Sequence, residues 1–248
     1  MSPTEMTRRS TLTIAAGVVA VGITSSSLLA TPAAAAPQPL RNDKLKAALR
    51  RAEARRRRIL TGRASANGWE MQKAADDEGD IATRHVEGTP LRVPVRTGDV
   101  EQVLAHVIRR FHYEVDALGL HGEPNPLAGW VAPSSIRDSR LPESNQASGT
   151  AIVVRPAFYP PGAQGGFTSV QELTIRDIVA DAEGVVRWGG DDRRRYEGLF
   201  YLDVPPGNAH LGRVAAKVRA WSEKPGAGAG FVPDVTAATR RRRAAQFR

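Results

Sequence analysis

The sequence SNQASGTAIV, at residues 144–153, joins a polar loop to a short apolar segment. Four of the five residues at 150–154 are β-branched, which favours a buried strand. Two later segments, 185–188 and 199–204, have a similar apolar character and are separated by the polar turn 189–197. We therefore predict three short strands in the second half of the chain.

Three helices are expected around these strands. Apolar residues recur every three or four positions from Val100 to Leu118, and segments 169–182 and 209–222 are also predicted to be helical. Segment 82–96 contains two prolines and is expected to form one or two edge strands. Strands and helices alternate too irregularly for a doubly wound sheet. The pattern predicts an α+β fold, with a small antiparallel sheet packed with helices.

The positive charge of the chain is concentrated at its ends. The 248 residues include 35 Lys or Arg and 26 Asp or Glu, a formal net charge of +9. Residues 41–63 carry +8, 240–248 carry +5 and 1–40 carry +1, which leaves −5 for 64–239. Neither basic segment has the interleaved aromatic residues that stack on bases, so no nucleic-acid partner is predicted. The absence of Cys excludes disulfides, cysteine-ligated metals and thiol nucleophiles.

Residues 1–36 have the features of a signal peptide. Arg8 and Arg9 precede a weakly apolar stretch that glycines and serines interrupt, and the alanines at 33–36 offer cleavage positions. The arginine pair resembles the twin-arginine export pattern. A spanning helix needs about 20 firmly apolar residues. We therefore expect a cleaved signal rather than an anchor, and a protein that is secreted or associated with the cell wall.

The remaining chain divides into four predicted parts. Residues 41–63 form a basic helix with a narrow apolar stripe. This pattern suits an anionic surface, and it equally suits a solvated helix whose stripe packs on the domain. Residues 64–94 are predicted to be a connector and 95–222 the main domain. The arginine-rich segment 223–248 is predicted to be a flexible basic tail.

Three segments together resemble a known family. SNQASGTAIV at 144–153, GVVRWGGD at 184–191 and EGLF at 197–200 are similar to motifs of bacterial D-alanyl-D-alanine carboxypeptidase-like zinc peptidases. That family includes phage endolysins and VanY-type cell-wall peptidases. The resemblance covers roughly 95–204 and implies the DD-carboxypeptidase/Hedgehog-like fold, here preceded by a basic helix.

All three zinc ligands that the resemblance implies are replaced. Gln146 and Leu199 stand where the family has His, Val153 stands where it has Asp, and Glu197 stands at the general-base position. A catalytic zinc site needs about three protein ligands. We therefore expect no cofactor, no zinc hydrolysis and only a vestigial Glu197. The alternative is a zinc site rebuilt from relocated ligands.

Other residues offer little for a rebuilt site. His112 and Asp116 are four residues apart on the predicted long helix, where packing or a surface hydrogen bond is the simpler role. His210 follows the last predicted strand. No His-Glu-x-x-His or Gly-x-Ser-x-Gly motif occurs in the sequence, although a Ser-His-Asp triad stays open.

A domain that keeps the cleft and loses the metal retains a surface for a peptide end. Arginine suits bidentate carboxylate recognition, and the resemblance implies this role for Arg137 or Arg140. We expect a cleft lined by Arg137, Arg140, Ser144, Gln146, Ser148, Arg187, Asp191 and Glu197.

The predicted function is therefore an exported, cell-wall-associated pseudo-peptidase. Its expected partner is peptidoglycan or another anionic wall polymer, with a peripheral membrane contact through 41–63 as a further hypothesis. Two alternatives stay open. One is an active peptidoglycan carboxypeptidase or endopeptidase with relocated ligands, and the other is a basic structural or interaction protein of the cell envelope.

Overall fold

The computed structural model describes residues 43–76, 79–124, 126–224, 229 and 233–247. Asp43–Arg248 form one compact unit. The predicted signal peptide at 1–36 lies outside the described residues. Within the described ranges, every helix is too short or too polar to span a bilayer.

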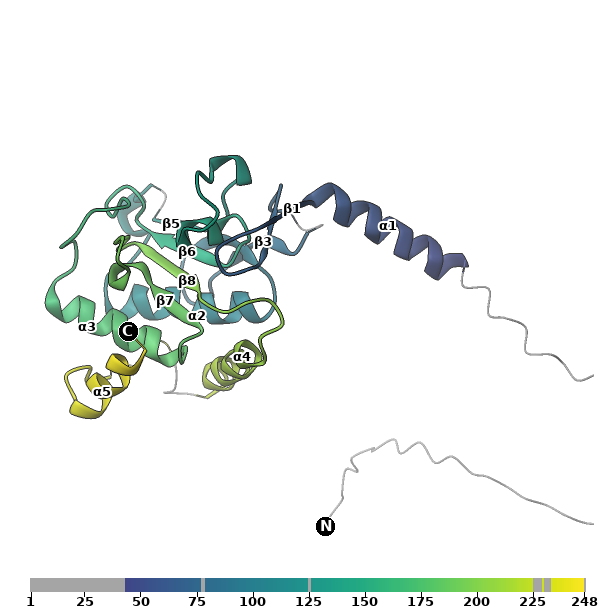
Figure 1. Ribbon diagram of the computed structural model, residues 1–248. Coiled ribbons are helices and arrows are strands. Elements are labelled where there is room, and N and C mark those ends of the chain that lie inside the picture. Colours follow the sequence, from purple (N-terminus) through teal and green to yellow (C-terminus); the bar gives the residue numbers. More distant parts are fainter. Residues whose placement is uncertain (1–42, 77–78, 125, 225–228, 230–232, 248) are drawn as a thin grey trace, which may run out of the picture. The chain divides into compact units, whose positions relative to one another are not determined.

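A four-stranded antiparallel sheet lies at the centre of this unit, in the order β5-β6-β8-β7 (Figure 1). β6 (Ala151–Val154) and β8 (Leu199–Leu202) are the inner strands, and β5 (Leu127–Ala128) and β7 (Val186–Trp188) lie at the edges. The α+β class and the three strands predicted from apolar segments are confirmed. β5 was not predicted, because two residues are too few to carry a pattern that indicates a strand.

Three helices cover one face of the sheet: α2 (Asp99–Glu114), α3 (Ser169–Asp181) and α4 (Ala209–Ser222). Their apolar side chains meet Ile152 of β6 and Phe200 of β8 in one core. Phe111 of α2 is fully buried there, and its ring contacts the ring of Phe200 edge-on at 6.0 Å between centroids. Because side chains alternate along a strand, Val153 and Leu199 point to the opposite face.

Two hairpins precede α2. β1 (Leu60–Ala64) pairs with β2 (Glu70–Gln72), and β3 (Ile81–His85) pairs with β4 (Arg92–Arg96). The second hairpin corresponds to the predicted edge strands. Backbone hydrogen bonds join β4 to loops beside the sheet, from Trp130 N to Pro94 O (2.7 Å) and from Arg96 N to Gly149 O (2.8 Å). Gly149 is required there, since its φ is +70° and a Cβ would lie 2.8 Å from Arg96 N.

A buried polar network ties the β1–β2 turn to the loop before β6. The Ser65 hydroxyl bonds the Ser148 hydroxyl at 2.8 Å, and the Asn67 amide donates to the Thr150 hydroxyl at 2.9 Å. Asn145 Oδ1 accepts from Asn67 N at 3.1 Å. Buried polar groups are stable only when they are hydrogen-bonded. The segment predicted as a connector, 64–94, is therefore bonded into the folded body.

The end of the chain forms α5 (Ala238–Gln246), inside the segment predicted as a flexible tail. Arg240 bonds Asp177 of α3 at 2.6 Å, Arg243 bonds Asp181 at 3.1 Å, and Ala244 is buried. The arginines are three residues apart and lie on one face of the helix. The difference from the prediction arises because their acidic partners lie some 60 residues earlier in the chain.

The two aspartates belong to a buried ionic cluster around Arg110 of α2. The Arg110 guanidinium bonds Glu114, Asp177 (3.0 Å) and Asp181 (2.7 Å), and its side chain is 3% exposed. Burial lowers the pKa of Arg110, but the three acids outweigh burial and raise it. Arg240 and Arg243 bring the count of charges in the cluster to three of each sign. The three acids outnumber Arg110, and the two arginines of α5 balance the remaining negative charge.

We expect the double variant Arg240→Gln/Arg243→Gln to lower the free energy of unfolding by about 1–3 kcal/mol in urea titration. Breaking a fully buried pair costs about 3–5 kcal/mol, and these arginines are 33% and 36% exposed, which reduces the effect. The matched control is Arg241→Gln/Arg242→Gln, which changes two exposed residues of the same helix. An equal loss of stability in both double variants would contradict a specific role for the ion pairs of Arg240 and Arg243.

Stability should fall at low pH through Asp181. Burial raises the pKa of this carboxyl, but the His106 hydrogen bond and the charges of Arg110 and Arg243 outweigh it and lower the pKa to about 2, from 3.8. Because the folded pKa is the lower one, the stabilisation is present above about pH 4 and is lost as the pH falls towards 2. The loss is on the order of 2 kcal/mol. Urea unfolding from pH 5 to pH 2 measures it, and an unchanged pH slope in Asp181→Asn would contradict this assignment.

Candidate functional site

Val153 and Leu199 are direct cross-strand partners on β6 and β8. Together with Ala151 and Tyr201 they form a second apolar cluster, on the face of the sheet opposite the helices. The side chains are sealed from solvent, since Val153 is 1% and Leu199 is 0% exposed. Two positions that the resemblance assigns to zinc ligands thus lie side by side and are filled by hydrocarbon.

Gln146 approaches the same cluster from the loop side. It ends the short helix Pro142–Gln146, and its Nε2 donates to the carbonyl of Gly129 at 2.9 Å. Gly129 directly follows Ala128, which packs against the Val153–Leu199 cluster. The short helix also contacts β6 and β8, so the three positions that the resemblance assigns to zinc ligands lie in one region of the structure.

The residues in this region do not fit a catalytic zinc ion. Valine and leucine side chains have no lone pairs to donate, and glutamine is a poor zinc ligand. In the described part of the chain, no group of three or more His, Cys, Asp or Glu side chains is arranged to hold a metal ion. At two of the positions that the resemblance assigns to ligands, the structure has a packed apolar contact.

Comparisons with protein-family models, curated proteins and solved structures find no match for this chain.

Glu197 is buried, at 2% exposed, and holds a glycine loop. Its two carboxylate oxygens accept from Gly165 N at 2.7 Å and from Gly166 N at 2.9 Å. A Cβ on Gly166 would lie 2.5 Å from the Tyr159 ring, so only glycine brings its N–H this close. The Glu197 carboxylate therefore accepts hydrogen bonds from two backbone N–H groups and holds the loop in place, which is a structural role.

Ser144 and Ser148 are also internal, each 0% exposed. Ser144 Oγ accepts from Ala66 N and donates to Ser139 O, both at 2.9 Å. Ser148 belongs to the network that holds the β1–β2 turn. These two residues of the predicted cleft therefore shape the loop and do not lie on a surface that a ligand reaches.

Asp191 and Arg187 have different partners. Arg176 of α3 binds Asp191 with two nitrogens, at 2.8 and 3.1 Å, so Asp191 fastens the turn after β7 to a helix. Arg187 pairs with Tyr201 in the strand register and is 39% exposed. Its guanidinium lies 3.6 Å from Asp192 and from Asp203. Arg187 is therefore a residue of the predicted cleft whose side chain is accessible to solvent.

Several polar groups are joined to the sealed cluster through the hydroxyl of Tyr201 or lie on loops nearby in the sequence, and we call them the polar rim: Glu143, Arg187, Asp192, Arg194 and the Tyr201 hydroxyl. The Tyr201 hydroxyl lies 3.0 Å from both oxygens of Asp192, and Arg194 bonds Glu143 at 2.9 Å. Burial is the main cause that raises the pKa of both Asp192 and Tyr201.

Four of the five rim residues are absent from the predicted cleft: Glu143, Asp192, Arg194 and Tyr201. The sequence could have indicated Tyr201, because it follows Leu199 by two residues on a strand and must share its face. Glu143 lies in the short helix Pro142–Gln146, and Asp192 and Arg194 lie in the turn between β7 and β8, where spacing does not predict a face.

Arg137 and Arg140 are both exposed, on the loop before the Pro142–Gln146 helix. Arg140 pairs with its neighbour Asp138 at 3.1 Å, and this pairing lowers the pKa of Asp138. The charge of Arg194, a rim residue, contributes to the same shift.

The histidines serve local packing. His112 Nδ1 accepts from Leu118 N at 2.9 Å, while Asp116 pairs with Arg155, so the two do not act together. His210 Nε2 lies 3.0 Å from the carbonyl of Glu183. These contacts agree with the simpler role that the sequence favoured for His112.

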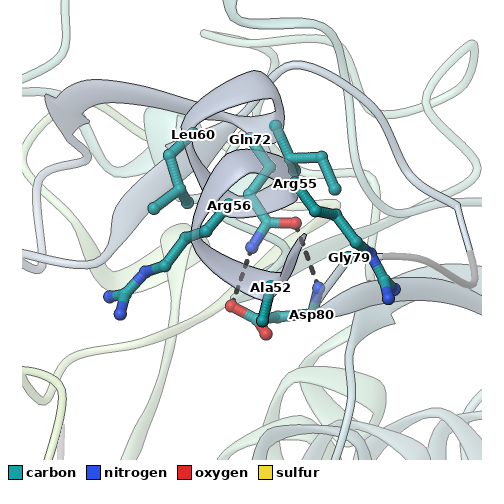
Figure 2. Close-up of a pocket in the computed structure, with 8 residues that line it drawn as sticks. Ala52, Arg55, Arg56, Leu60, Gln72, Gly79 and Asp80 are labelled. Atoms are coloured by element: carbon teal, nitrogen blue, oxygen red, sulfur yellow. Dashed lines mark hydrogen bonds between the residues drawn. The ribbon is translucent and has the colours of Figure 1, made fainter. Parts of the chain in front are cut away.

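The larger cavities lie away from the sealed cluster. One of about 530 Å³ is lined by the last turn of α1 (Asp43–Ile59) together with Gln72 and Asp80. Figure 2 shows Arg55 and Arg56 directed to opposite sides of it and the Gln72 amide bonded to Asp80. The two guanidiniums do not converge, so the cavity presents no focused anion site.

We expect Glu197→Gln to lower the free energy of unfolding by about 1–3 kcal/mol in thermal or urea unfolding, because a neutral amide replaces a buried carboxylate that accepts two N–H groups. Gly166→Ala should destabilise the same loop by a steric route. Glu87→Gln, at an exposed position, is the matched control. Wild-type stability of Glu197→Gln would contradict the structural role.

Proposed function

We propose that the protein is an exported, cell-wall-associated pseudo-peptidase with the carboxypeptidase-like fold, which binds peptidoglycan peptide without zinc hydrolysis. The observation that carries the proposal is the direct contact of Val153 and Leu199 near Gln146. The short helix that ends at Gln146 contacts both strands, so the three positions that the resemblance assigns to a ligand set lie in one region, which supports an ancestral metal site there. Val153 and Leu199 have no donor atoms, and glutamine is a poor zinc ligand.

Binding in this proposal takes place at the polar rim and not in the sealed cluster. Arg187 is the exposed cation of β7, and Arg137 and Arg140 are exposed on the loop nearby. Carboxylates of the rim, such as Glu143 and Asp192, lie beside them. Cell-wall peptides carry both carboxylate and amine groups, and a surface of mixed sign offers partners to both.

The predicted export of the chain also supports a partner in the cell wall. Arg8 and Arg9 with the alanine tract at 33–36 predict passage through the membrane, which would bring the chain to the wall. Replacing both arginines by lysine should retain the precursor in the cytoplasm. Cell fractionation followed by immunoblotting measures this, and unchanged export would remove this part of the proposal.

The binding test uses residues 37–248, which contain the compact unit Asp43–Arg248, and insoluble peptidoglycan in a pull-down. We expect retention of the wild type and several-fold weaker retention of Arg137→Gln/Arg140→Gln/Arg187→Gln. The control Arg241→Gln/Arg242→Gln/Arg193→Gln removes the same charge at exposed positions. Equal loss in both would mean nonspecific charge binding. Stoichiometric zinc with release of D-alanine would replace the proposal by the active-peptidase alternative.

The triple variant Gln146→His/Val153→Asp/Leu199→His tests the ancestral site directly. Without metal we expect it to be several kcal/mol less stable, because an acid and an imidazole enter an apolar cluster. With zinc we expect one bound ion per chain and recovery of the melting temperature, measured by metal analysis and thermal unfolding. The double variant Val153→Asp/Leu199→His keeps Gln146 and should bind zinc more weakly. A triple variant that folds yet retains no zinc would show that the three positions are not a ligand set.

A further inference from the structure

Helix α1 is exposed along almost its whole length. Every residue from Asp43 to Arg58 is exposed, and only Ile59 at its C-terminal end is buried. Leu45 and Leu49 are each 54% exposed, which is unusual for leucines one helical turn apart. The sequence left open whether the apolar stripe packs on the domain. In the structure the N-terminal half of that stripe is not covered by the described residues.

The first part of the helix, up to Glu53, separates apolar from basic side chains. At about 100° per residue, Leu45, Ala48, Leu49 and Ala52 fall within an arc of about 100°. Six basic residues lie outside this arc: Lys44, Lys46, Arg50, Arg51, Arg57 and Arg58. Near the C-terminal end of the helix, Arg56 falls within the arc and Arg55 at its margin. Eight basic residues stand against Asp43 and Glu53, which makes the net charge of the helix +6.

We propose that α1 binds the surface of an anionic lipid bilayer, with Leu45 and Leu49 inserted at the headgroup–acyl boundary and the basic side chains above them. Each basic group near an anionic surface contributes attraction, and the leucines contribute by leaving water. The helix then lies in the plane of the interface and does not cross the bilayer.

A soluble or wall-bound polyanion explains the structure less well. Such a partner gains from the lysines and arginines, but it offers no apolar phase to Leu45 and Leu49. A bilayer satisfies both sides of the helix at once. The inference concerns a surface separate from the polar rim, so it goes beyond peptide binding and does not depend on it.

The experiment is vesicle flotation of residues 37–248, which contain the compact unit, at low and at physiological salt. Vesicles of phosphatidylcholine alone are compared with vesicles in which half of the lipid is phosphatidylglycerol. We expect binding to the anionic vesicles and little to the neutral ones. Loss of binding at higher salt is expected to be partial, because apolar insertion is not screened.

Two variants separate the contributions. Leu45→Gln/Leu49→Gln keeps the charge and the helix propensity and should weaken vesicle binding at least about tenfold. Its matched control is Val170→Gln, at an exposed apolar position on α3. Arg50→Gln/Arg57→Gln should weaken binding roughly fivefold for each arginine, and its control is Arg92→Gln/Arg193→Gln, both exposed.

Circular dichroism of each variant checks that the fold is retained. Absence of wild-type binding to anionic vesicles would overturn the proposal. Wild-type binding by Leu45→Gln/Leu49→Gln would overturn it too. Combined with retention of that variant on immobilised poly(glycerol phosphate), this result would assign α1 to a wall polymer instead.

Discussion

The antiparallel pairing of β6 with β8 is the constraint on which the rest of the structure depends. Its register sets Ile152 against Phe200 and Val153 against Leu199, one pair for each face of the sheet. The first pair enters the core that the helices cover, and the second enters the sealed cluster. A slip of one residue in one strand would turn its side chains to the opposite face and disrupt both clusters.

The polar groups beside the sealed cluster serve the fold. Glu197 holds Gly165 and Gly166, and Ser148 holds the β1–β2 turn. These residues lie in the segments that carry the resemblance, yet their bonds are to backbone or to one another. An unsatisfied buried polar group is costly, so these bonds give each residue a structural role.

Charge in this protein has two separate uses. At Arg110, acids and arginines from α2, α3 and α5 are brought together away from water, where each charge needs its partners. On α1, basic residues face solvent beside exposed leucines. The net charge of +9 does not by itself distinguish the buried charges around Arg110 from the exposed charges of α1. The arginines of α5 look like those of α1 in the sequence, and only their partners differ.

The sequence by itself determined the local elements and the chemistry that is missing. Periodicity predicted α2, α3 and α4, β-branched segments predicted three strands, and residue types alone excluded zinc ligation by Val153 and Leu199. These properties depend on neighbouring residues or on single side chains. The tertiary structure decided what depends on distant partners. It buried Ser144, Ser148 and Glu197, bonded 64–94 into the body, docked α5 on α3 and left Leu45 and Leu49 exposed. No sequence pattern encodes such contacts, because the groups that make them are tens of residues apart.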